Sequence, residues 1–221
     1  MGALEIIFKY REGLLRGLGV TLQLCCLVWG IGLLIGSAIG IAGARFPATV
    51  GAWSRVLAFA LSGIPILVLL FWLHYPAQAI AGVVIDPFAT AVVALSVVNS
   101  AAVAETVRPA LTSFPQQYIS AGQVCGLTNS ELLWHVQMPI VLRQVIPPLL
   151  TLQVNMLQAT LFASLISVEE VFRVAQRINA IEYRPVAVYT VLALLFLAIC
   201  LPLNGLAIWL QRSFSRDLSD K

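Results

Sequence analysis

Few side chains in this sequence could do chemistry, and those that could lie within or beside long apolar runs. Glu105 and Arg108 stand three residues apart, so on a helix they share a face and can form an ion pair. Such a carboxylate is either a solvated partner at a helix end or a group that faces the path of a solute. Asn155 and Gln158 have the same spacing, and their amides either hydrogen-bond between helices or line that path.

The patterns typical of catalysis or metal binding are missing from the sequence. The two histidines, His74 and His135, are far apart, and no cluster of ligands has the spacing of a metal site. The sequence has no Gly-x-x-x-x-Gly-Lys-Ser/Thr loop, so the chain is not expected to hold a nucleotide itself. The four cysteines do not form a disulfide framework, and a net charge of +3 without a basic stripe does not indicate nucleic-acid binding. We therefore expect no catalytic residue, no metal and no cofactor in this chain.

The elements that position these residues are expected to be membrane helices. The chain has 221 residues, of which 60% are hydrophobic and 10% are charged, whereas a soluble domain has roughly 25% charged residues. Crossing the hydrocarbon core takes about 20 apolar residues as a helix, which satisfies its own backbone hydrogen bonds in lipid. Five apolar runs are long enough. They predict an all-α polytopic membrane protein, residues 1–221 forming one domain, with spans at about residues 17–44, 56–75, 87–112, 140–166 and 185–211.

The first 16 residues differ from the spans because charged and apolar residues alternate at helical spacing. This pattern predicts that residues 1–16 form an amphipathic helix in the membrane interface. Five spans place the two termini on opposite sides of the membrane. With the N-terminus outside, 7 of the 13 lysines and arginines are inside, so the positive-inside rule barely distinguishes the two orientations.

Small residues within the spans indicate close helix packing and one break. Gly32, Gly36 and Gly40 recur every four residues and predict a face on which another helix backbone packs closely. In the second span, Gly63 and Pro65 free backbone carbonyls, which marks either a packing kink or a break that lines a cavity. The candidates for a solute path are this glycine, this proline and the polar residues of the spans, namely Gly63, Pro65, Asn99, Glu105, Asn155 and Gln158.

A polar, almost uncharged insert at about residues 115–138 separates the third and fourth spans. Pro115 suits the first turn of a helix, Gly126 ends that helix, and Ser130 with Glu131 begins another. The polar side chains exclude this insert from lipid, so we expect it at the aqueous surface. It is either an idle loop or a helix that docks into a groove on another protein.

The insert resembles the cytoplasmic coupling loop of ABC importer permeases, in particular the polar amino-acid uptake family. The stretches "QYISAGQVCGL", "VQMP" and "LRQVIPPL" carry this resemblance. The family's loop has a glutamate and two alanines, then a glycine and a proline, and the residues at these positions are Ser120, Ala121, Gly122, Gly126 and Pro139. Further matches occur in the family's order: "GLGVTLQL", "LSGIPIL", "AVAETVR" and "RPVAVYTVLALLFLAICLPL". The resemblance covers about residues 17–212.

The resemblance implies a type I ABC importer transmembrane domain in a bacterial cytoplasmic (inner) membrane, with the N-terminus periplasmic and the C-terminus cytoplasmic. The insert would be the coupling helix, and the five loop residues would transmit the motion of a cytoplasmic ATPase dimer. That ATPase, and not this chain, would bind ATP. The implied partners also include a second permease chain, either a sister or another copy, and a periplasmic solute-binding protein. Membrane lipid surrounds the spans.

The sequence departs from the family's pattern at positions that build the loop and the solute pocket. Ser120 replaces the loop's glutamate, and Ser62 and Ile64 replace an arginine and a threonine of the second span. Gln158 and Ala159 stand where relatives have a lysine-aspartate pair. The pocket face of this chain is therefore less charged than usual. Either a partner permease carries the charged side of the site, or the solute is less cationic than arginine or histidine.

Three classes of function are weighed on these features. The resemblance implies a permease subunit of an ATP-driven importer that translocates a polar amino acid or a related small solute. The alternative is an ATP-independent membrane channel or secondary carrier, but the internal repeat common in such proteins is not found. A membrane enzyme would need a reactive constellation of side chains, which the sequence does not offer.

Overall fold

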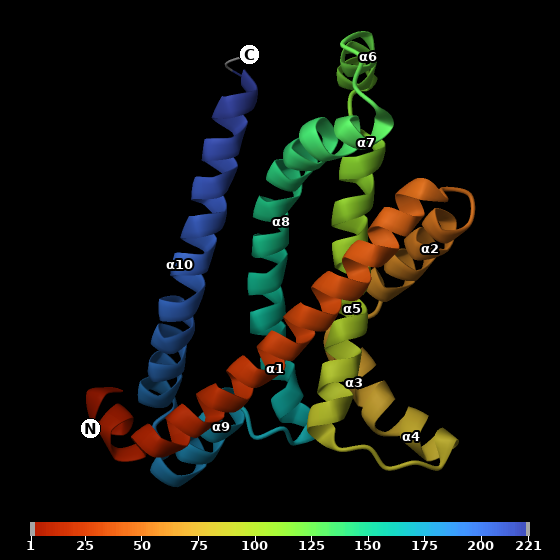
Figure 1. Cartoon of the computed structure of the whole chain (residues 1–221). Coiled ribbons are helices and arrows are strands. Elements are labelled where there is room, and N and C mark those ends of the chain that lie inside the picture. Colours follow the sequence, from red (N-terminus) through yellow and green to blue (C-terminus); the bar gives the residue numbers. More distant parts are fainter. Residues whose placement is uncertain (1–2, 220–221) are drawn as a thin grey trace.

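The computed structural model describes residues 3–219, and all the secondary structure in that part of the chain is helical (Figure 1). The long apolar helices are α1 (Ala3–Arg45), α5 (Pro87–Thr112), α8 (Met138–Ala159) with its flanking turns, and α10 (Pro185–Ser219). The helix α2 (Val50–Ser62) is followed by α3 (Ile66–His74) and α4 (Pro76–Ala81). The segment formed by α3 and α4 makes a bent pair with α2, with an angle of 95° between them. These regions make four candidate spans, or five if the bent pair counts as one, so the predicted all-α membrane fold is confirmed.

The diagonal helix α1 packs closely against α5 through the predicted glycine face (Figure 1). A Cβ added at Gly32 would lie 2.2 Å from Nδ2 of Asn99, and one at Gly36 would lie 2.6 Å from the carbonyl oxygen of Ser100. At Gly40 the added atom would lie 2.9 Å from Cβ of Val107. These distances are shorter than van der Waals contact, so only glycine permits this approach. The predicted close-packing face is confirmed.

Residues 3–16 of the predicted interfacial helix and the first span both lie in α1. The helix is kinked at Tyr10, within the predicted interfacial segment, where φ is −111° and ψ is 17°. At this kink Lys9 Nζ and Tyr10 Oη both donate to Oε1 of Glu182 at 2.6 Å. The hydrogen bonds from Lys9 and Tyr10 hold the pKa of Glu182 below its usual range. Residues 1 and 2 of the predicted interfacial helix lie outside the described residues.

The amphipathic helix α9 (Val171–Glu182) lies between the last two spans. Its buried residues Val171, Ala175 and Ile178 pack on the N-terminal part of α1 and the start of α10. The carboxylate of Glu170 caps α9 by accepting the N–H groups of Phe172 and Arg173, each at 2.8 Å. Glu170 lies outside the spans but is fully buried, and this burial raises its pKa to about 7 despite the two hydrogen bonds.

The central core forms where α1, α5 and α8 meet and α3 covers them. Leu24, Val28, Leu95, Met156 and Ile166 are among its buried members. After Ala159 the fourth span tightens into the 3₁₀ helix η2 (Thr160–Ile166). The C-terminal end of α10 lies at the same end of the bundle as α6 (Gln116–Val124), whereas the N-terminus, α4 and α9 lie at the other end (Figure 1).

Candidate functional site

The first candidate site is the loop between α5 and α8, which projects from one end of the bundle (Figure 1). Its first helix, α6, has no buried residue. Ser120 and Ala121 are exposed, and Val124, in the same helix, is 89% exposed. The exposed side chains of α6 have no role in the packing of this chain, so this helix face is available to another protein.

The shape of the loop is fixed by contacts within the loop. A Cβ added at Gly122 would lie 2.3 Å from Cδ2 of Leu132, which is buried at the start of the π-helical turn η1 (Leu132–Gln137). Gly122 therefore lets α6 cross closely over η1. Pro139 follows in the first turn of α8, where a helix tolerates proline.

The turn between α6 and the following helix agrees with the predicted break at Gly126. Gly126 has φ of +81°, a left-handed conformation that glycine adopts without a steric penalty. The next helix, α7 (Asn129–Glu131), starts with Thr128 as its cap. The N–H of Thr128 donates to Oε2 of Glu131 at 2.8 Å, and the N–H of Glu131 donates to Oγ1 of Thr128 at 3.3 Å. The sequence signal of this capping box is Thr-x-x-Glu. The prediction that the helix begins at Ser130 did not use this signal.

The second candidate site starts at the broken second span. Gly63 and Pro65 lie in the break between α2 and α3, where the chain turns by 95°. The N–H of Ile64 donates to the carbonyl of Leu61 at 3.3 Å, and the regular helix resumes only when Leu69 donates to Pro65 at 3.1 Å. Irregular backbone at membrane depth is tolerated where it is packed or lines a cavity. Ser62, directly before the break, lines such a hollow.

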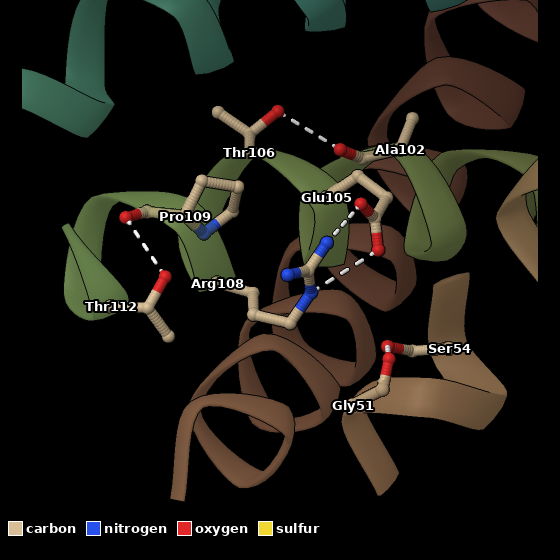
Figure 2. Close-up of polar contacts among 8 residues, drawn as sticks. All are labelled: Gly51, Ser54, Ala102, Glu105, Thr106, Arg108, Pro109 and Thr112. Carbon is tan, nitrogen blue, oxygen red and sulfur yellow. Dashed lines mark hydrogen bonds and ion pairs between the residues drawn. The ribbon is translucent and has the colours of Figure 1, made fainter. Parts of the chain in front are cut away.

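That hollow lies between α2 and α5 and has a volume of about 530 Å³. It is lined by one cation, one carboxylate, one hydroxyl and apolar walls: Arg55, Ala58, Phe59, Leu61, Ser62, Val98, Ala101, Ala102 and Glu105. Figure 2 shows Glu105 and Arg108 facing each other on α5, near Gly51 and Ser54 of α2. Arg108 Nε donates to Oε1 of Glu105 at 3.3 Å, and Arg108 Nη2 donates to Oε2. The predicted ion pair is confirmed, and its carboxylate also faces a hollow.

Asn99 lies elsewhere, in the interior between α1, α5 and α8. Its Nδ2 donates to the carbonyl of Val28 and to Oε1 of Gln153, each at 3.0 Å, and Gln153 Nε2 donates back to Oδ1 of Asn99 at 3.3 Å. Asn99 and Gln153 are both buried. The structure therefore places Asn99 in an interhelical hydrogen-bond pair, away from the hollow beside Glu105.

Asn155 and Gln158 both face α10, in agreement with the common face that their spacing predicts, but only Asn155 lines a hollow. Asn155 lines a separate hollow of about 560 Å³ between α8 and α10, together with Arg143, Thr151 and Gln211. Gln158 Nε2 lies 3.9 Å from Sγ of Cys200 on α10. The six predicted path residues are thus spread over a break, two hollows, the core and, for Gln158, a contact with α10. The cation Arg55 and the hydroxyl of Ser62 belong to the first hollow but were missing from the predicted set.

Residues 32–216 match the family described as binding-protein-dependent transport system inner membrane component. The chain belongs to this family. The permease is 30% identical over 205 residues to the glutamine transport system permease protein of Escherichia coli strain K12, covering 90% of this chain and 91% of the relative. It is 34% identical over 162 residues to the L-cystine transport system permease protein of Bacillus subtilis strain 168, covering 73% of this chain and 69% of the relative.

Two solved structures have the fold of this permease. The crystal structure of an amino acid ABC transporter with histidines superposes with a TM-score of 0.83 at 24% identity, covering 96% of this chain and 99% of the other. The inward-facing MetNI methionine ABC transporter gives a TM-score of 0.71 at 21% identity, covering 93% and 98%. The predicted type I importer fold is confirmed, and the chain is an inner-membrane permease component.

Proposed function

We propose that this permease is the membrane-spanning subunit of an ATP-driven importer for a polar amino acid or a related small solute. The support is the names of its relatives, which are permease proteins for glutamine, for L-cystine and for histidine, lysine, arginine and ornithine. The polar side chains along the second, third and fourth spans fit such a solute better than an apolar one. ATP is bound by a separate ATPase, and this chain contributes no cofactor and no catalytic residue.

The orientation that we propose has the N-terminus in the periplasm and the C-terminus in the cytoplasm. Because α6 lies at the same end as the C-terminus, it then faces the cytoplasm (Figure 1). A solute-binding protein delivers the solute at the opposite end, where α4 and α9 lie. A second permease chain completes the path, as a sister subunit or as another copy.

The observation that carries the proposal is the exposed helix α6 with its internally fixed turn. An ATPase dimer that closes on ATP moves this helix, and the contact between Gly122 and Leu132 transmits the motion to η1 and α8. Ser120, Ala121, Gly126 and Pro139 complete the coupling loop. The hollows lined by Glu105 and Asn155 then open alternately to the two sides as the helices rock. Gly63 and Pro65 allow the second span to bend during this motion, and Gln158 and Asn99 connect the moving helices.

The test is to purify the importer with its ATPase and solute-binding protein and to measure uptake into proteoliposomes. Val124→Glu places a charge on the outer face of α6 without breaking a contact in this chain, so the ATPase should no longer copurify and uptake should stop. Val84→Glu is the matched control, because Val84 is fully exposed at the opposite end and its replacement should leave ATPase binding intact.

Two outcomes contradict the proposal. If Val124→Glu retains both the ATPase and uptake, α6 is not the coupling helix. If the wild-type permease transports solute in vesicles that lack ATP, the ATP-independent channel or carrier is the correct function.

A further inference from the structure

The hollow between α2 and α5 carries opposite charges on walls that are otherwise apolar. Arg55 comes from α2 and Glu105 from α5, and Phe59, Leu61 and Val98 form much of the remaining lining. Three alanines of the lining keep the hollow open because they are too small to fill it. Its volume of about 530 Å³ falls within the range of roughly 300–1,000 Å³ that small-molecule sites occupy.

Arg55 is a cation without a partner in this hollow. It lies in α2, part of the bent pair that qualifies as a membrane span, and no hydrogen bond or ion pair to it occurs among the described residues. A charge in such a position is costly and usually serves an ion or substrate pathway. An anionic group in the hollow would give the Arg55 guanidinium a partner.

Glu105 is the complementary acceptor. Each of its oxygens accepts one N–H of Arg108, whereas a carboxylate offers about four acceptor sites. Arg108 is the more buried partner, with 12% of its side chain exposed compared with 31% for Glu105. The buried arginine therefore holds the carboxylate from the interior side, and the remaining acceptor sites of Glu105 are open to a cationic group in the hollow.

We propose that this hollow binds the main-chain end of an α-amino acid, with its ammonium on Glu105, its carboxylate on Arg55 and its side chain against Phe59, Leu61 and Val98. The inference rests on the proposed function and adds which groups of the amino acid are recognised and which residues recognise them. The hollow recognises the zwitterion, whereas a solute that lacks either the free ammonium or the free carboxylate is rejected. Recognition of the common end explains how a pocket with few charges can serve an amino acid whatever its side chain.

The experiment uses the assembled importer in proteoliposomes with Ala102→Cys as a reporter in the hollow, in a background where the exposed Cys26 and Cys125 are replaced by serine. The rate of modification of this cysteine by a small thiol reagent is measured with increasing concentrations of an equimolar mixture of the standard amino acids other than cysteine, whose own thiol would consume the reagent. The same mixture with acetylated amino groups, and the same mixture with amidated carboxyl groups, are the matched probes. Uptake of the standard mixture is measured in parallel.

The amino-acid mixture should slow modification, and the two blocked mixtures should not. Arg55→Gln and Glu105→Gln should each raise the concentration for half-protection by about tenfold, the effect of losing one charge-assisted hydrogen bond of average strength. Arg11→Gln and Glu12→Gln, which remove exposed charges of α1, are the controls and should leave protection unchanged. Since Arg55 makes no hydrogen bond or ion pair among the described residues, Arg55→Gln separates ligand binding from misfolding.

The zwitterion site is wrong if uptake is normal but the mixture gives no protection, or if the blocked mixtures protect equally well. It is also wrong if Arg55→Gln leaves protection unchanged. A wild-type importer that takes up no amino acid with ATP overturns the proposed function instead, so the two failures are distinguishable.

Discussion

The replacement Gly36→Ala tests the packing of α1 on α5 that positions Glu105. The added Cβ would lie 2.6 Å from both the carbonyl oxygen of Ser100 and Cβ of Val103, whereas ordinary contact begins at 3.4 Å. The two helices must therefore separate locally by about 0.8 Å, and overpacking of this kind costs about 1–3 kcal/mol. Alanine returns about 1 kcal/mol of helix propensity, so we expect a net loss of up to about 2 kcal/mol. For a chain of this size the melting temperature should fall by up to about 8 °C.

The assay uses the two buried thiols, Cys25 and Cys200, as reporters of unfolding. With Cys26 and Cys125 replaced by serine, a maleimide dye becomes fluorescent only as the permease melts and these thiols are exposed. Gly30→Ala is the matched control in the same helix, because no atom lies within 4 Å of its added Cβ. This control should melt at or above the wild-type temperature. Equal melting temperatures for Gly36→Ala and Gly30→Ala would show that α1 does not approach α5 as closely as described.

Three further predictions concern the coupling turn, the α9 cap and the buried amide pair. Gly126→Glu and Gly126→Ala should both reduce uptake, because the left-handed conformation at this position costs about 1–2 kcal/mol for a residue with a side chain. Gly126→Asn should reduce uptake less, and equal uptake by all three variants would contradict a conformational role. The pKa of Glu170 in the folded chain, about 7, exceeds its ordinary value of 4.5, so the folded state binds the extra proton and the free energy of unfolding should fall by about 2–3 kcal/mol from pH 5 to pH 8. Glu170→Gln should remove this pH dependence of the melting temperature, and a parallel curve for the variant would refute the assignment. Asn99→Ala should lower the free energy of unfolding by about 1–2 kcal/mol, because it leaves the buried Gln153 unpaired. In the same melting assay, replacing both Asn99 and Gln153 by leucine should restore much of this stability. An equal loss in the double variant would show that the pairing is not the cause.

Local patterns predicted the features that depend on backbone geometry. Gly32, Gly36 and Gly40 recur at helical spacing, which is enough to define a face before its partner is known. Gly126 predicted a break because glycine readily adopts positive φ, and the structure has φ of +81° there. The pair of Glu105 with Arg108 followed in the same way, since residues three apart on a helix are neighbours.

Features that depend on how distant segments meet could not be predicted. Gly63 and Pro65 indicated a break, but the bend of 95° is set by the packing of α3 on α5 and η2. Asn99 was a candidate for the solute path because a polar residue in a span gives no sign of its partner, and its partner Gln153 lies 54 residues away. Arg55 directly precedes the predicted second span at 56–75, and nothing in the local pattern indicates its place in the hollow beside Glu105.

The proposed coupling loop keeps its shape through contacts within the loop, and this separates its support from its outer surface. Gly122 against Leu132, and Thr128 with Glu131, maintain the loop from within, while Ser120 and Val124 point outward and contribute nothing to that support. Under the proposed coupling role, the outward residues can diverge together with the surface of the partner ATPase, and a change there alters pairing without unfolding the loop. Exchanging only these outward side chains between two permeases is then a route to redirect one of them to the ATPase of the other.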